Sequence, residues 1–188
     1  AFDADPNVGD AQRGSLPLHI ALESNSYSLV KLFFTSSRQF VNVGHEDRAG
    51  NTALHVVAAQ SGVSGHMAAG ELRQIVELLL AHSSNPSALN HRGQSVLHLL
   101  CANQNLRNSE EAREVASLLL SHRVHSSHRQ SPFVNLCTLK TRDYSTALHE
   151  SAMGGDMLMS KLLVRHGADM NAPLPDSQKR EGPNGRQR

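Results

Sequence analysis

The amino-acid sequence returns to one short pattern four times, at a period of about 30 to 50 residues. The four stretches are GSLPLHIAL (14–22), GNTALHVVA (50–58), GQSVLHLLC (93–101) and YSTALHESA (144–152). An apolar run follows each of them, namely SLVKLFF (28–34), QIVELLL (74–80), EVASLLL (114–120) and LMSKLLV (158–164). Such units are predicted to stack as helix pairs, because each pair must bury its apolar face against a neighbour.

Residues that favour helix starts stand at equivalent places in these units. A hydroxyl occurs three residues before the histidine at Thr52, Ser95 and Thr146. There it can cap a helix by accepting a hydrogen bond from an early backbone N–H, and the histidine then occupies the third helical position. Pro17 falls in the first turn of its helix, where a missing N–H costs nothing.

Glycine marks the turns of the same units. It stands before the helix at Gly14, Gly50 and Gly93. Gly167 follows the last turn of its own helix, as a left-handed C-terminal residue does. The first and last units depart from this pattern, because Leu16 replaces the hydroxyl and Tyr144 replaces the turn glycine. We expect these two helices to be capped less well.

The last unit, TALHESAMGGDMLMSKLLVRHGADMN (146–171), resembles the ankyrin repeat along nearly its whole length. That family's pattern is T-P-L-H-x-A, a second helix with V-x-x-L-L, and then H-G-A-D-x-N. The resemblance covers about residues 1–172 and implies an all-α solenoid of helix-turn-helix units with β-hairpin-like finger loops. It also implies a protein-interaction function without catalysis.

The units differ in length, which predicts insertions. We expect a partial repeat at 1–10 and a disordered tail at 173–188, where Pro, Gly and mixed charge occur without periodicity. The full repeats are expected at about 11–46, 47–89, 90–139 and 140–172, with insertions near 60–70, 103–111 and 123–140. Ser109 followed by EEAREV predicts a new helix cap with acidic residues in the first turn.

The chain has twelve histidines, a number that raises the question of a metal site. Repeat positions account for seven of them, at His19, His55, His82, His98, His122, His149 and His166. The pair His149–Glu150 begins like a helical zinc-protease motif, but Met153 stands where the second histidine is needed. The series His122, His125 and His128 has no cysteine or carboxylate beside it. We therefore predict no metal and no cofactor.

Composition excludes several other classes of protein. The formal net charge of +1 gives no global electrostatic reason to bind nucleic acid or an anionic membrane. No apolar run approaches the roughly 18 residues of a spanning helix. The two cysteines, Cys101 and Cys137, form no CxxC pair and favour a reducing compartment, the cytoplasm or nucleus. Without a GxSxG, HExxH or phosphate-binding glycine motif, we predict no enzyme and no small-molecule substrate.

A stack of helix pairs offers a concave groove and finger loops for a partner protein or peptide. The residue after each repeat histidine is variable in the family and tends to face the groove, which here gives Ile20, Val56, Leu99 and Glu150. The predicted partner contacts are Asp47, Arg48, Asn51, His91, Arg92, Gln94, Leu99, Arg142, Asp143, Tyr144 and Glu150. The predicted core is Leu18, Ala21, Leu32, Leu54, Ala58, Leu78, Leu79, Leu97, Leu118, Leu119, Leu148, Ala152 and Leu162.

Three functions stay open at this stage. The first is a protein-interaction module, expected as a monomeric fragment of a larger intracellular protein. A more specific form of it is a transcription-factor inhibitor similar to the inhibitor-of-NF-κB group, suggested by FVNVGHEDRAGNTALHVVA (40–58). The second is an enzyme, which would need a nucleophile, a base and an orienting group in one pocket. The third is a recruitment domain for a ubiquitin ligase or kinase encoded outside this sequence.

Overall fold

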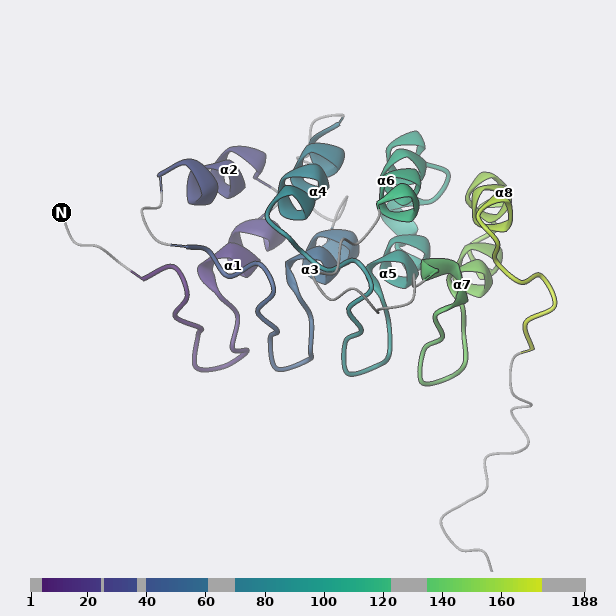
Figure 1. The fold of residues 1–188 in the computed structure, drawn as a ribbon, viewed down its shortest axis with the longest axis horizontal. Helices are drawn as coiled ribbons and strands as arrows, with labels where there is room; N and C mark the ends of the chain where they lie inside the picture. The colour runs from purple at the N-terminus through teal and green to yellow at the C-terminus, as the bar shows by residue number, and fades with distance from the viewer. Residues whose placement is uncertain (1–4, 25, 37–39, 61–69, 123–134, 174–188) are drawn as a thin grey trace, which may run out of the picture.

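The fold is a row of helix pairs with loops hanging from one side (Figure 1). A computed structural model describes residues 5–24, 26–36, 40–60, 70–122 and 135–173. Within these ranges the helices are α1 (Pro17–Glu23), α2 (Tyr27–Ser36), α3 (Ala53–Gln60), α4 (Glu71–Ala81), α5 (Val96–Ala102), α6 (Glu110–Ser121), α7 (Ala147–Met153) and α8 (Met157–Arg165). Two short 3-10 helices, η1 (Gln104–Leu106) and η2 (Leu136–Thr138), stand in the longer connections.

The helices form two layers. The inner helices α1, α3, α5 and α7 pack in sequence against one another, and the outer helices α2, α4, α6 and α8 form the second layer. Each inner helix also packs against the outer helix that follows it. No strand occurs in the ranges that the structure describes. The predicted all-α solenoid is confirmed.

Leu and Val side chains from both layers fill one continuous core. Leu54, Leu79, Leu97 and Leu119 are each no more than 1% exposed. Among the predicted core residues, Leu18, Ala21, Leu54, Ala58, Leu79, Leu97 and Leu119 are buried, whereas Leu78, Leu118, Leu148 and Leu162 are half-buried.

Two predicted core residues are exposed. Leu32 is 52% exposed, because α2 turns Val30, Phe33 and Phe34 toward the core instead. This set has the spacing i, i+3, i+4, which places Leu32 on the opposite side of the helix. Ala152 is exposed because α7 is the last inner helix described, and the described residues contain no further helix pair to cover its outer side.

Two of the repeat histidines, His55 and His98, join their helix pair to the next one. In His55 and His98, Nδ1 accepts the backbone N–H of Thr52 and Ser95, at 3.1 and 3.2 Å. The neutral ring therefore carries its proton on Nε2. That nitrogen donates to the carbonyl oxygen of Gln94 or Ser145, each of which belongs to the following unit, at 3.0 and 3.2 Å.

The predicted hydroxyl caps take a different form. In all three units that have one, the hydroxyl lies 2.8 to 2.9 Å from the histidine Nδ1. Since Nδ1 already accepts the backbone N–H, the hydroxyl donates to the ring, and the ring makes the cap.

The two units that depart from the pattern behave differently from each other. At α1, Leu16 has no hydroxyl, the bond from its N–H to His19 Nδ1 is 3.3 Å, and His19 Nε2 lacks a hydrogen-bond partner among the described residues. The weaker cap predicted there is confirmed. At α7 the prediction is wrong, because Thr146 makes the same two contacts to His149 as its counterparts do.

The inserted segment 103–111 bridges neighbouring repeats. The Asn103 amide donates to the carbonyls of Ala58 and Ala59 near the end of α3, at 2.9 and 3.3 Å. Glu111 Oε1 accepts the Leu72 N–H in the first turn of α4, at 3.0 Å. The segment thus satisfies backbone groups of the second helix pair at both sides of residues 61–69.

The same segment caps its own helix and contacts the fourth pair. Ser109 accepts from the Ala112 N–H, and Glu110 and Glu111 occupy the first turn of α6, as predicted. The Asn108 N–H donates to Asp156 Oδ2 at 2.8 Å, while Asp156 Oδ1 caps α8 through the Met159 N–H. The predicted insertion near 60–70 falls outside the described residues except for its two ends, Gln60 at the end of α3 and Gly70 before α4. The one near 123–140 is described only from residue 135, and the tail only at residue 173.

Candidate interaction surface on the fingers and inner helices

Four loops hang below the inner helices, and we call them the fingers (Figure 1). They comprise residues 10–15, 47–51, 90–94 and 141–145. A backbone hydrogen bond joins each finger to the next: Arg48 N to Arg13 O at 2.8 Å, His91 N to Ala49 O at 2.9 Å, and Arg142 N to Arg92 O at 3.0 Å. These bonds set the order and the close spacing of the fingers.

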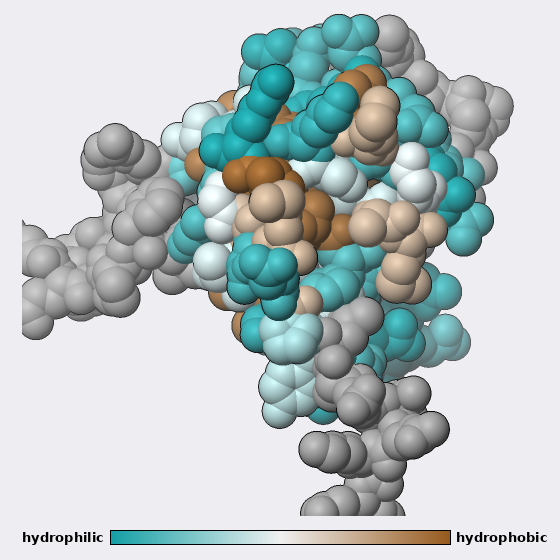
Figure 2. All heavy atoms as spheres, turned by 90° about the vertical axis from the view of Figure 1, so that its right-hand side faces the viewer, coloured by the Kyte–Doolittle hydropathy of each residue, from teal (hydrophilic) through white to brown (hydrophobic). Residues whose placement is uncertain are grey.

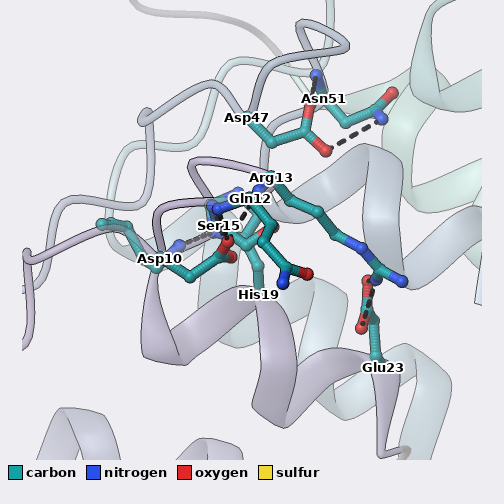
Figure 3. A network of polar contacts seen from close by, with 9 residues as sticks. Asp10, Gln12, Arg13, Ser15, His19, Glu23, Asp47 and Asn51 are labelled. Carbon is teal, nitrogen blue, oxygen red and sulfur yellow. Dashed lines mark hydrogen bonds and ion pairs between the residues drawn. The ribbon is translucent and has the colours of Figure 1, made fainter.

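A polar side chain at the start of each finger holds its turn. Asp10 accepts the N–H groups of Gln12, Arg13 and Ser15, at 2.6 to 3.0 Å (Figure 3). Hydrogen bonds to a carboxylate favour its charged form, and the one from Arg13 contributes most to lowering the pKa of Asp10. The same position is occupied by Asp47, Asn90 and Thr141, which also accept from later N–H groups of their fingers.

This arrangement gives several predicted contact residues a role inside the protein. Asp47 Oδ2 accepts from the Asn51 amide at 3.2 Å, and Asn51 Oδ1 accepts from Asn90 at 3.0 Å. The Asn90 amide also lies 3.3 Å from Gln94 Oε1. The side chains of Asp47, Asn51 and Gln94 therefore belong to a network that fixes two neighbouring fingers.

The predicted turn glycines adopt the left-handed conformation. Gly14, Gly50 and Gly93 have φ values of 66°, 77° and 73°. A side chain at two of them would also collide with the next finger, since a Cβ on Gly50 or Gly93 would lie 2.8 or 2.9 Å from a backbone nitrogen there. Tyr144, in the fourth finger, adopts the same conformation with φ 61° and is 58% exposed.

In the second, third and fourth fingers, the residue two places before the one with positive φ lies across the preceding finger. Arg48 Nη1 donates to Gln12 O at 2.8 Å, and its Cγ lies 3.5 Å from the place of a Cβ on Gly14. His91 covers Gly50 in the same way, and Arg142 begins beside Gly93. The sequence prediction named all three, and all three are exposed.

A hollow of about 290 Å³ lies between the second and third fingers and the inner helices. It brings together five of the predicted residues, Asp47, Asn51, Arg92, Gln94 and Leu99. The sequence prediction missed the other lining residues, Glu23, Ala49, His55, Val56, Ala59 and Asn90, as contacts. The sequence could have identified Val56, because this residue follows a repeat histidine and was placed among the positions that face the groove.

The positions after the repeat histidines run from apolar to acidic along the stack, as the sequence indicates. Ile20 is 52% exposed, Val56 is 7% exposed and Leu99 is half-buried. At the fourth position Glu150 Oε1 accepts from the Ser145 hydroxyl at 2.8 Å. This bond holds the Glu150 carboxylate against the fourth finger at Ser145, the residue after Tyr144.

The first finger carries an ion pair on its inner side. Arg13 Nη1 lies 3.2 Å from Glu23 Oε1 at the end of α1 (Figure 3). Elsewhere in the described ranges, no three His, Cys, Asp or Glu side chains come together as a metal site would require. None of the helices described is both long and apolar enough to cross a bilayer.

The C-terminal end of the stack exposes apolar side chains (Figure 2). Met157 and Met170 are 61% and 73% exposed there, and both line a hollow of about 620 Å³ together with Leu148 and Val164. His149, which has the place of His55 and His98, also lines this hollow. The next helix pair would cover these atoms in an internal repeat.

Comparison with known proteins agrees with this architecture. The family model described as ankyrin repeats (3 copies) matches residues 65–173, which is more than half of the chain. The protein therefore belongs to the ankyrin repeat family, whose repeats are protein-interaction modules. It is similar to the B-cell lymphoma 3 protein homolog of Mus musculus, with 28% identity over 165 residues. That alignment covers 85% of this chain, and the chain spans only 30% of the relative's length.

Proposed function

We propose that this chain is a non-catalytic interaction module that binds a partner protein or peptide with its fingers and the groove beside the inner helices. Tyr144 is the observation that carries the proposal. A non-glycine residue pays a conformational penalty of about 1 kcal/mol or more at positive φ, and a bulky one is a clear outlier. Three of the four fingers avoid this penalty by using glycine.

The described residues supply no ring contact that would offset the cost of placing Tyr144 there. Tyr144 is 58% exposed, and its ring makes no aromatic or cation–π contact within the described residues. Backbone strain of this kind persists at ligand-binding sites, and tyrosine is among the side chains enriched at the centres of protein interfaces. A fingertip that presents Tyr144 beside Arg142 and Glu150 is therefore suited to contact a partner.

The test separates stability from binding. Partners are captured from a cell lysate on the immobilised 188-residue chain, identified, and then measured against purified variants. Tyr144→Gly is expected to raise the free energy of unfolding by about 1 kcal/mol while lowering the affinity for the partner. Ser83→Gly is the matched control, because Ser83 also has positive φ, 67°, but lies at the end of α4 away from the fingers.

The control is expected to gain stability and to bind as the parent does. Retention of every partner by Tyr144→Gly, and by the triple variant at Arg142, Tyr144 and Glu150, would refute the proposal for the fourth finger. Turnover of a substrate by the purified chain would refute the non-catalytic assignment.

The narrower alternatives identified in the sequence are compatible with the same surface. One is a transcription-factor inhibitor similar to the inhibitor-of-NF-κB group. The other is a recruitment domain for a ubiquitin ligase or kinase. Both fit a monomeric module acting in the cytoplasm or nucleus with a protein, rather than nucleic acid, as its partner. The identity of the captured protein, a transcription factor or an enzyme substrate, distinguishes them.

A further inference from the structure

We propose that the row of basic side chains across the fingertips recognises an acidic, extended segment of the partner. The row consists of Arg48, His91 and Arg142, and we call it the fingertip ladder. This inference rests on the proposed function, because it names the chemistry of the partner that the fingers bind.

The three residues occupy one register position in consecutive fingers. Each stands two places before the residue with positive φ, at Gly50, Gly93 or Tyr144. Their backbone N–H groups are the ones that bond to the preceding finger, at 2.8, 2.9 and 3.0 Å. Because these bonds hold each finger against the preceding one, the starting points of the three side chains are set before any partner arrives.

No carboxylate of the described residues forms an ion pair with a ladder residue. The ion pairs of the described residues are Arg13–Glu23, Arg73–Glu77 and Arg73–Glu114, and none of them includes a ladder residue. Among the described residues, the Arg48 guanidinium donates to a neutral carbonyl, Gln12 O, which holds it across the first finger. Guanidinium groups in such a row match carboxylates, to which they can donate two hydrogen bonds at once.

The spacing of the ladder sets the spacing of the acidic residues it would bind. Neighbouring helices pack about 8 to 10 Å apart, and the fingers follow the helices that carry them. An extended chain rises about 3.3 Å per residue, so every third residue of a bound segment meets the next finger. An acidic residue at every third position of the partner is therefore the expected motif.

A peptide fits this surface better than a nucleic acid. Asp143 stands beside Arg142 at the exposed tip of the fourth finger, so the surface carries both signs of charge. A peptide can place a neutral or basic residue opposite Asp143, whereas a nucleic acid presents a phosphate at every step. Domains that bind nucleic acid also carry a clustered basic patch and a strongly positive overall charge, whereas this whole chain has a net charge of only +1.

The experiment measures binding of labelled peptides to the full chain by fluorescence anisotropy. One peptide of about ten residues carries glutamate at every third position, separated by Gly and Ser. A second has the same composition with its glutamates contiguous. The spaced peptide is expected to bind more tightly, and the double variant Arg48→Gln/Arg142→Gln is expected to weaken it about two- to 25-fold.

The double variant Lys161→Gln/Arg165→Gln is the control, because it removes two exposed cations from α8 and leaves the fingers intact. Equal loss of affinity in both double variants, or equal binding of the two peptides, would overturn the proposal. So would a single-stranded oligonucleotide that binds more tightly than the spaced peptide through the same two arginines. If Tyr144→Gly loses the captured partners but the spaced peptide does not bind the parent chain, only the proposal for the ladder is rejected. If Tyr144→Gly keeps the partners, the proposed function of the fourth finger is rejected.

Discussion

Acidification is expected to unfold this protein through its buried histidines. His19, His55 and His98 are each no more than 1% exposed, and burial lowers the pKa of all three below the usual value. In each ring Nδ1 accepts a backbone N–H, so protonation of Nδ1 would remove the helix cap. The folded state therefore binds protons less readily than the unfolded chain does.

The sign and size of the effect follow from this difference. The stabilisation is complete above the unfolded pKa of about 6.5 and is lost as the pH falls from there toward the lowered folded values. In that window each histidine costs about 1.4 kcal/mol of unfolding free energy per pH unit. From about pH 7.5 to about pH 5.5, three such residues remove up to about 4 kcal/mol, a large part of the stability of a typical domain.

Urea denaturation followed by circular dichroism at a series of pH values measures this slope. His98→Gln is expected to reduce the loss by up to about 1.4 kcal/mol, whatever its effect at neutral pH, because one linked proton is removed. A free energy of unfolding that stays constant or rises as the pH falls through this range would refute the assignment of neutral, capping histidines.

Three further outcomes are expected. Ser83→Gly should stabilise the chain by about 0.5 to 1 kcal/mol in thermal or chemical denaturation, because Ser83 has φ 67° where the last repeat has Gly167 at 90°; no gain would show that the strain at Ser83 is relieved elsewhere. Glu111→Ala should lower the free energy of unfolding by about 0.5 to 2 kcal/mol and speed hydrogen exchange in the first turn of α4, because Glu111 accepts the Leu72 N–H. Glu110→Ala is the control, and equal effects of the two substitutions would contradict the bridge between Glu111 and α4. Burial raises the pKa of the Cys101 and Cys137 thiols, that of Cys137 to about 11. A thiol reagent at about pH 8 should therefore label the two cysteines only when urea unfolds the chain. Rapid labelling of the native protein would contradict this.

The sequence predicted the features that depend on local spacing. The histidine at the third helical position, the turn glycines before the inner helices, and Pro17 in the first turn of α1 all follow from short-range backbone chemistry. Leu32 was misplaced because SLVKLFF is apolar on several sides of a helix, so its periodicity does not select one face. The choice of Val30, Phe33 and Phe34 depends on what α2 packs against, and a single sequence does not contain that information.

Contacts between units were harder to predict than contacts within them. Asn103, Asn108 and Glu111 lie in an insertion, where the repeat pattern gives no register. Their partners are 39 to 48 residues away, and only the stacked geometry brings them together. For the candidate surface, the sequence named the exposed fingertips and also Asp47, Asn51 and Gln94, whose hydrogen bonds within the fingers could not be foreseen from residue type.

The buried histidines connect the stability of the stack to the surface proposed to bind a partner. His55 and His98 cap an inner helix with Nδ1 and hold the carbonyl of Gln94 or Ser145 with Nε2, and these two residues belong to the third and fourth fingers. Ser145 in turn donates to Glu150 and follows Tyr144 directly. The position of the fourth finger therefore depends on a neutral His98, because a protonated ring loses its helix cap. Partner affinity is expected to fall in the same pH window as stability, and more steeply than the partner's own titration explains.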